Sequence, residues 1–244
     1  MRYALAAAGF RNEEPLFNKQ VILDAMEKCA GKADLVLFGE AFLQGFYGVT
    51  FEETYDEGIF ITRKDPILCE IGKAAKEREI AVSFGFLEKE GASFYSSQIT
   101  IGRDGRILDL YRRVSPGWKE PFAGDRYREG EEFHVFAFGN QKIVVGLCGD
   151  FWFDENVAQV KALNPDVVLW PVYTDYNPDQ WNTSMKLEYA EQAGLLCDNV
   201  LYVNSFCLDK EGEEIARGGA AWFHQGMIRR ETPSGKEDIL FLEV

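Results

Sequence analysis

Short apolar runs alternate with longer amphipathic stretches along this chain, and that alternation limits the folds open to it. Runs of strand length occupy residues 3–8, 35–38, 80–87, 96–101, 135–138, 143–147, 167–170, 201–205, 220–223 and 239–242. Apolar positions at helical spacing occupy residues 17–30, 67–78, 155–163 and 182–197. The alternation favours parallel strand pairing with helices on the outer face, while residues 85–107 resemble an antiparallel hairpin with its turn at 103–105. We therefore expect an α/β fold with a mixed sheet.

Length, charge and cysteine content narrow the class of protein further. The chain has 244 residues, 46% of them hydrophobic, so we expect one domain over residues 1–244. A net charge of -14 repels nucleic acids and anionic membrane surfaces, so we expect neither as a partner. Residues 1–9 are apolar but too short for a signal-peptide core or a membrane span. Five widely spaced cysteines favour no disulfide framework and no metal site, which fits a cytoplasmic protein.

Cys148 stands where an apolar run meets a Gly-Asp turn, in residues 144–150 (VVGLCGD). A cysteine at the end of a strand can expose its thiol while nearby backbone N–H groups point outward, as nucleophilic attack and oxyanion stabilisation require. A small hydrophobic residue closing a core strand would give the same pattern, because free cysteine is among the most buried residue types. The groups available to activate the thiol decide between these interpretations.

Glu40 follows a second apolar run in the same way. Residues 35–38 lead through Gly39 to this carboxylate, which predicts a position at the edge of an α/β sheet where ligands gather. A glutamate at a helix N-terminus or on the surface is the competing interpretation. Histidine is the usual partner of a nucleophilic cysteine, but His134 and His224 are better explained as structural or surface residues. A carboxylate base is therefore the alternative to a Cys-His protease arrangement.

Several segments, in order and at matching spacing, resemble the carbon–nitrogen hydrolase (nitrilase) superfamily over nearly the whole chain. Residues 34–40 (DLVLFGE) resemble the glutamate strand, with Gly39 where proline is usual. Residues 105–113 (GRILDLYRR) resemble the segment that ends in the catalytic lysine, and residues 146–155 (GLCGDFWFDE) resemble the nucleophile motif. Further similar segments are residues 44–46, 167–171, 190–193 and 198–205.

The resemblance implies a four-layer αββα sandwich with mixed sheets, built into homodimers or higher homo-oligomers. It implies that Cys148 attacks a small amide, carbamoyl compound or nitrile, with Glu40 as base, and that no metal or organic cofactor takes part. The thioester formed on the cysteine would then be hydrolysed by water. We therefore expect an amidase or ω-amidase type of activity.

The cation of the triad is where this sequence departs from the family. Arg113 occupies the lysine position, and arginine holds positive charge but does not readily give up a proton. Lys119 follows six residues later, and Glu120 resembles the extra active-site carboxylate of the family's amidases. An exposed ion pair in a loop would explain Lys119 and Glu120 equally simply. Both Arg113 and Lys119 remain candidates for the cation.

Residues near these motifs are the candidates for substrate binding. The aromatic side chains of Phe46, Trp118, Trp152 and Tyr173 could wall a compact apolar pocket, although most aromatic residues in such a chain belong to the core. Gly149 would supply a backbone N–H to the oxyanion beside the cation.

Two other functions remain open. Arginine in place of lysine is compatible with a catalytically impaired family member that binds a carboxamide-like metabolite without converting it. A cysteine acyltransferase, in which an amine or thiol replaces water, would use the same nucleophile. The identity of the amide is not encoded in any of these motifs.

Overall fold

The structure, a computed structural model, describes residues 1–209 and 215–244 and contains two large β-sheets. The first sheet consists of β1 (Arg2–Ala7), β3 (Leu35–Leu37), β4 (Ala81–Glu90), β5 (Ser93–Ile101), β6 (Ile107–Arg112) and β14 (Asp238–Glu243). The second consists of β7 (Val135–Phe138), β8 (Gln141–Val145), β9 (Val167–Val172), β10 (Asn199–Asn204), β12 (Ala220–His224) and β13 (Met227–Thr232). Their strand orders are β14-β1-β3-β4-β5-β6 and β13-β12-β10-β9-β8-β7.

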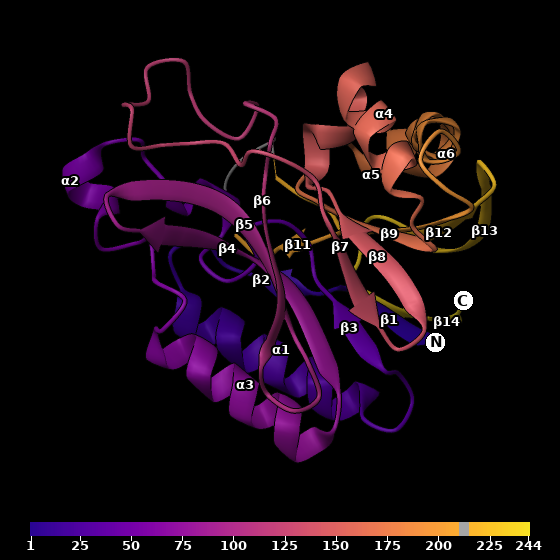
Figure 1. Ribbon diagram of the computed structural model, residues 1–244, viewed down its shortest axis with the longest axis horizontal. Coiled ribbons are helices and arrows are strands. Elements are labelled where there is room, and N and C mark those ends of the chain that lie inside the picture. Colours follow the sequence, from indigo (N-terminus) through magenta and orange to yellow (C-terminus); the bar gives the residue numbers. More distant parts are fainter. Residues whose placement is uncertain (210–214) are drawn as a thin grey trace.

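Helices cover the outer face of each sheet (Figure 1). The helices α1 (Pro15–Cys29) and α3 (Pro66–Arg78) pack on the first sheet, and α4 (Asp154–Leu163) and α6 (Lys186–Ala193) pack on the second. The shorter elements are β2 (Gly9–Phe10), β11 (Phe206–Cys207), α2 (Glu53–Asp56), α5 (Pro178–Gln180), a π-helical turn (Trp181–Met185) and 3₁₀ turns η1 (Phe46–Gly48) and η2 (Cys148–Trp152).

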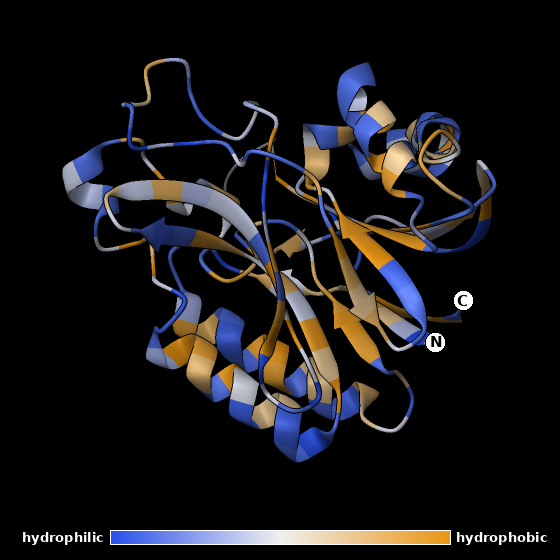
Figure 2. Cartoon of the chain, viewed as in Figure 1, coloured by the Kyte–Doolittle hydropathy of each residue, from blue (hydrophilic) through white to orange (hydrophobic). Residues whose placement is uncertain are grey.

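The alternation of side chains along β1 explains why the layers stack as they do. Tyr3, Leu5 and Ala7 point into the core shared by the two sheets, while Ala4 and Ala6 point toward α1 and α3. Successive strand residues face opposite sides of a sheet, so a strand covered on both sides is apolar throughout. In Figure 2 the central strands are largely hydrophobic, and the helices on either side of them carry hydrophilic residues. The predicted αββα sandwich is confirmed.

Strand pairing within each sheet is mixed, as predicted. β1, β3 and β4 pair in parallel, and so do β8, β9 and β10. β4, β5 and β6 pair antiparallel, with the predicted turn at residues 103–105 between the last two. Within the described residues, no helix has both the length and the apolar character needed to cross a bilayer.

Two of the elements that differ from the sequence prediction have clear physical reasons. β13 was not predicted, because as an edge strand it carries Arg229, Arg230 and Glu231 and lacks a buried face of alternating apolar residues. The helix predicted over residues 182–197 is regular only over α6. It is preceded by a π-helical turn, in which Thr183 and Ser184 hydroxyls donate to carbonyls four residues back and compete with the helical pattern.

A long segment without helix or strand, residues 113–134, follows β6. Backbone hydrogen bonds near its C-terminal end attach it to β5 and to the residue after β6. Gly130 N–H donates to the Arg113 carbonyl, and Arg128 N–H donates to the Phe94 carbonyl on β5. The segment therefore begins and ends beside β6 and crosses the end of the first sheet between these points.

His134, in the connection between β6 and β7, contacts β6 through a hydrogen bond that can be tested by titration. Its Nε2 atom lies 2.6 Å from Asp109 Oδ1 on β6, and this hydrogen bond raises the pKa of His134 above its ordinary value. A raised folded-state pKa means that the stabilisation is complete below about pH 6.5 and is lost as the pH rises through the folded-state pKa. The unfolding free energy from urea titrations should therefore fall more between pH 6 and pH 8.5 in the native protein than in His134→Gln. Equal pH dependence in the two proteins would contradict this attachment.

Candidate active site

Glu40 lies just beyond β3 and is completely buried. Its Oε1 atom accepts hydrogen bonds from Arg113 Nη1 at 2.8 Å and from Ser96 Oγ at 3.1 Å. Its Oε2 atom is also buried but has no hydrogen-bond partner among the described residues. One oxygen of the carboxylate is thus anchored, and the other is uncommitted.

Arg113 follows β6 directly and is only 3% exposed. Its backbone N–H donates to the Ser96 carbonyl, and its Nε donates to Ser115 Oγ at 2.9 Å. Burial acts to lower the pKa of Arg113, but the charge and hydrogen bond of Glu40, together with the charge of Asp150, oppose burial, and the pKa is raised above its ordinary value. The guanidinium therefore remains charged inside the protein.

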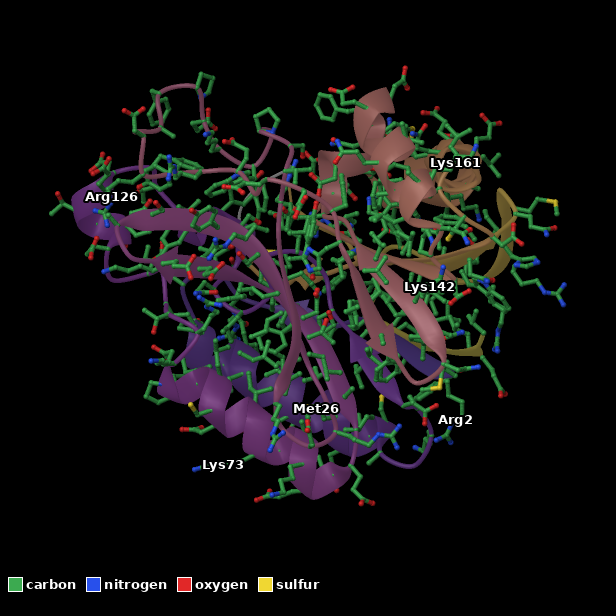
Figure 3. The ribbon with its side chains drawn as sticks, viewed as in Figure 1. Arg2, Met26, Lys73, Arg126, Lys142 and Lys161 are labelled. Atoms are coloured by element: carbon green, nitrogen blue, oxygen red, sulfur yellow. The ribbon has the colours of Figure 1, made fainter. Side chains whose placement is uncertain are left out.

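The position of this cation is unusual for the chain. Lys73, Lys142 and Lys161, which are labelled in Figure 3, are exposed, so water solvates each ammonium. A buried cation instead needs a paired anion and further hydrogen bonds to offset its desolvation. Glu40 and Ser115 supply both for Arg113.

Cys148 is the first residue of η2, immediately after the apolar run of β8. Its φ is +43°, in the left-handed region that non-glycine residues rarely adopt. The thiol donates to the Tyr173 carbonyl at 3.4 Å, and the Cys148 carbonyl accepts from Trp170 Nε1 at 2.8 Å. Contacts to β9 and the residue after it therefore hold the cysteine in this sharp turn.

The thiol is protonated in the resting site. Burial, and then the negative charge of Glu40, raise the pKa of Cys148 to about 12, while the positive charge of Arg113 acts in the opposite direction. A thiol with this pKa supplies almost no thiolate at neutral pH. Attack by Cys148 would therefore require a base that accepts its proton as the new bond forms.

Asp150 connects the cysteine turn to the segment that carries the arginine. Its Oδ2 atom accepts hydrogen bonds from the Tyr111 hydroxyl and from Leu147 N–H, both at 2.7 Å. Its Oδ1 atom accepts from Ser115 N–H at 2.8 Å. The carboxylate is completely buried, and burial raises its pKa against the opposing charge of Arg113.

Sequence reasoning did not identify Ser96, Ser115 or Asp150 as parts of the site. Ser96 has a weak signal, since it is a polar residue in a strand whose other residues are mostly buried. The hydrogen bonds of Ser115 and Asp150 join positions 35 residues apart, so nothing in the local pattern of either residue predicts them.

The two candidate cations lie in different surroundings. Lys119 Nζ donates to the Tyr127 carbonyl at 2.8 Å and lies 2.8 Å from Glu129 Oε1. Glu120 is exposed, and within residues 1–209 and 215–244 its carboxylate has no hydrogen bond or ion pair. Of the two candidates, the one that contacts Glu40 is therefore Arg113.

A cavity of about 500 Å³ lies between η1 and the long segment after β6. It is lined by Phe46, Tyr47, Val49, Thr50, Phe51, Gly117, Trp118, Lys119, Glu120 and Phe122. The Phe46 ring stacks on the Tyr173 ring with centroids 4.5 Å apart. The backbone carbonyl of Tyr173 accepts the hydrogen bond that the Cys148 thiol donates. Glu40, Arg113 and Cys148 do not line the cavity, which is linked to Cys148 only through the contacts of Phe46 and Tyr173.

The predicted substrate-binding residues divide between this cavity and other places. Phe46 and Trp118 line the cavity, and Tyr173 supports its wall. Gly149 lies against Arg113. Trp152 does not line the cavity; it is 44% exposed, and its ring packs against Tyr189 of α6.

Comparison with known proteins identifies relatives of this chain. The profile of the family described as carbon-nitrogen hydrolase matches residues 8–194. An (R)-stereoselective amidase of Pseudomonas sp. is 26% identical over 169 residues, covering 69% of this chain and 59% of the relative. An N-carbamoylputrescine amidase of Arabidopsis thaliana is 27% identical over 176 residues, covering 66% and 57%. The matches thus span less than two thirds of these relatives.

A solved structure shows the same fold over the whole chain. An amidase of Nesterenkonia sp. AN1 superimposes with a TM-score of 0.78 at 20% identity, covering 100% of this chain and 90% of the other. A variant of that amidase carries the acetamide moiety of fluoroacetamide on its active-site cysteine.

The electrostatic coupling of Glu40 and Cys148 is directly testable. Glu40→Gln removes the negative charge that raises the pKa of the thiol and leaves the opposing charge of Arg113, so the pKa of Cys148 should fall. Thiolate absorbance near 240 nm, recorded during a pH titration, measures this pKa. The same titration of Cys148→Ala variants, with and without Glu40→Gln, subtracts the other four cysteines. An unchanged or higher pKa would show that the two groups do not interact.

Proposed function

This chain belongs to the carbon–nitrogen hydrolase family, and from that premise we propose that it hydrolyses a small amide through a thioester on Cys148. The observation that carries the proposal is the buried Glu40–Arg113 pair, whose charges act on the thiol of Cys148. The names of the amidase relatives support an amide as substrate. The modified cysteine of the structurally similar amidase supports a cysteine nucleophile.

In the first step the substrate acylates the cysteine. The Cys148 sulfur attacks the amide carbon while its proton passes to Oε2 of Glu40, the oxygen that has no partner in the described part of the chain. The C–S bond forms as the carbonyl π electrons move onto oxygen. The tetrahedral intermediate then collapses, the C–N bond breaks, and the proton held by Glu40 passes to the departing nitrogen. Ammonia or an amine leaves, and the acyl group remains on sulfur.

In the second step water releases the acid. Glu40 accepts a proton from water as the oxygen of that water attacks the thioester carbon. The C–S bond breaks, and the sulfur regains its proton from Glu40. The products are a carboxylic acid and an enzyme with the thiol and carboxylate restored. Glu40 therefore carries one proton in each direction during each half of the reaction.

Arg113 and the backbone of Gly149 stabilise the oxyanion that appears in both steps. A guanidinium held in a buried site acts without the screening that water gives, and its charge does not depend on pH in the working range. Arginine is suited to this role because the proton transfers pass through Glu40, so the cation never has to release a proton. Phe46, Trp118 and Tyr173 would form the walls around the rest of the substrate.

A catalytically impaired family member that binds a carboxamide-like metabolite is the second candidate. Arg113 at the position of the family's lysine is the observation that favours it. Ammonia release from a panel of small amides, ω-amides, carbamoyl compounds and nitriles separates the two candidates. Turnover that disappears in Cys148→Ala supports the hydrolase, because loss of a nucleophile removes the pathway without a comparable loss of stability. Binding without ammonia release across the panel would favour the impaired protein.

The two candidate cations should differ sharply in this assay. Arg113→Met should raise the barrier by about 2.7–4 kcal/mol, the usual cost of losing one oxyanion donor. Lys119→Met, which breaks a partly exposed pair with Glu129, should cost less than about tenfold in kcat. The double variant Glu40→Gln/Arg113→Met removes both charges of the Glu40–Arg113 pair, and its circular dichroism controls for misfolding. A larger loss in Lys119→Met than in Arg113→Met would reverse the assignment.

A further inference from the structure

The guanidinium of Arg113 is engaged on two of its three nitrogens. Nη1 donates to Glu40, and Nε donates to Ser115 Oγ at 2.9 Å. Nη2 has no hydrogen-bond partner among the described residues, although the side chain is only 4% exposed. The arginine therefore presents one nitrogen, with two uncommitted N–H donors, from a group that is otherwise fixed in position and in plane.

Two glycines make room for this nitrogen. A β-carbon at Gly149 would lie 2.8 Å from Nη2, and one at Gly117 would lie 3.1 Å from it. Both distances are shorter than ordinary contacts, so any side chain at either position would push the guanidinium aside. Nη2 consequently lies beside Gly149, the residue directly after the nucleophile, whose N–H is the other proposed oxyanion donor. We call Ser115, Gly117 and Gly149 the guanidinium seat.

The seat is tied to the nucleophile through one carboxylate. Ser115 N–H donates to Asp150 Oδ1, and Leu147 N–H donates to Asp150 Oδ2. Leu147 immediately precedes Cys148, so the same buried side chain fixes the serine that holds the arginine and the turn that holds the thiol. A shift of the seat relative to the thiol would require one of these hydrogen bonds to break.

We propose that Ser115 is a positioning residue that makes this site specific for arginine, by holding Nε so that Nη2 points at the substrate oxyanion. The inference rests on the proposed amide hydrolysis. A lysine at position 113 would carry a single ammonium on a flexible stem, without the planar fork that engages Glu40, Ser115 and the oxyanion together. On this proposal Arg113, at the family's lysine position, acts in catalysis, and the guanidinium seat accommodates its planar group.

A double-mutant cycle between positions 113 and 115 tests the proposal. Ser115→Ala should lower kcat by about tenfold or more with little change in KM, because the lost contact orients a group that acts in the transition state. In an Arg113→Lys background the same substitution should change kcat by less than about twofold, since no Nε is present for Ser115 to hold. An equal loss in both backgrounds would overturn the positioning role and leave a structural one.

A matched control separates positioning from general stability. Ser97 is also a buried serine of this region, and its Oγ donates to Glu88 Oε2 at 2.8 Å without contacting Arg113. Ser97→Ala should lower the unfolding free energy by an amount similar to Ser115→Ala but should leave kcat within about twofold of the native value. A comparable loss of kcat in Ser97→Ala would attribute the effect to destabilisation of the fold.

Hydrogen exchange at Arg113 tests the guanidinium seat without any substrate. Its result is therefore informative even if the proposed amide hydrolysis is wrong. In ¹⁵N NMR spectra the Nε–H of Arg113, identified by its absence in Arg113→Lys, should exchange slowly with water. Ser115→Ala should accelerate this exchange by about tenfold or more, because the buried donor loses its acceptor. Ser97→Ala should leave the exchange unchanged. An Nε–H that exchanges equally fast in native protein and Ser115→Ala would refute the seat, whereas absence of amide turnover alone would refute only the proposed function.

Discussion

The buried ion pair between Glu40 and Arg113 is the interaction on which the rest of the site depends. Removing two charges from water is costly, and the attraction between them offsets that cost only when further hydrogen bonds complete the geometry. Ser96 and Ser115 complete it, one on each side of the pair. Removal of one partner would leave an uncompensated buried charge, which typically costs about 3–5 kcal/mol. The pair therefore stabilises the same arrangement that sets the protonation of the thiol.

The sandwich brings these groups together from distant parts of the chain. Glu40 follows the end of β3 in the first sheet, and Cys148 follows the end of β8 in the second. In each sheet these strands lie within a parallel set, so their carboxyl ends meet at one edge. Arg113 reaches the same place from the end of β6, on the side of the first sheet that continues into the long irregular segment. The site thus depends on the packing of the two sheets as well as on either one.

The parts of the site that could be predicted from sequence are those with a local signal. An apolar run that ends in glycine and a carboxylate, or in cysteine and glycine, indicates Glu40 and Cys148 without tertiary information. The choice between Arg113 and Lys119 could not be made in this way, because it depends on the path of a segment without periodicity. The hydrogen bonds from Tyr111 and Ser115 to Asp150 could not be predicted either, because these partners are distant from Asp150 in the sequence. Edge strand β13 was missed because its side chains are largely exposed.

A covalent intermediate on Cys148 is the central claim, and partitioning with hydroxylamine tests it most directly. When a turned-over amide is offered together with hydroxylamine, the acyl-enzyme should be intercepted at the thioester carbon. The account predicts that hydroxamate replaces free acid in proportion to the hydroxylamine concentration, and that Cys148→Ala forms neither product. Amide hydrolysis by the native protein without any hydroxamate, or hydroxamate formation that persists in Cys148→Ala, would contradict it.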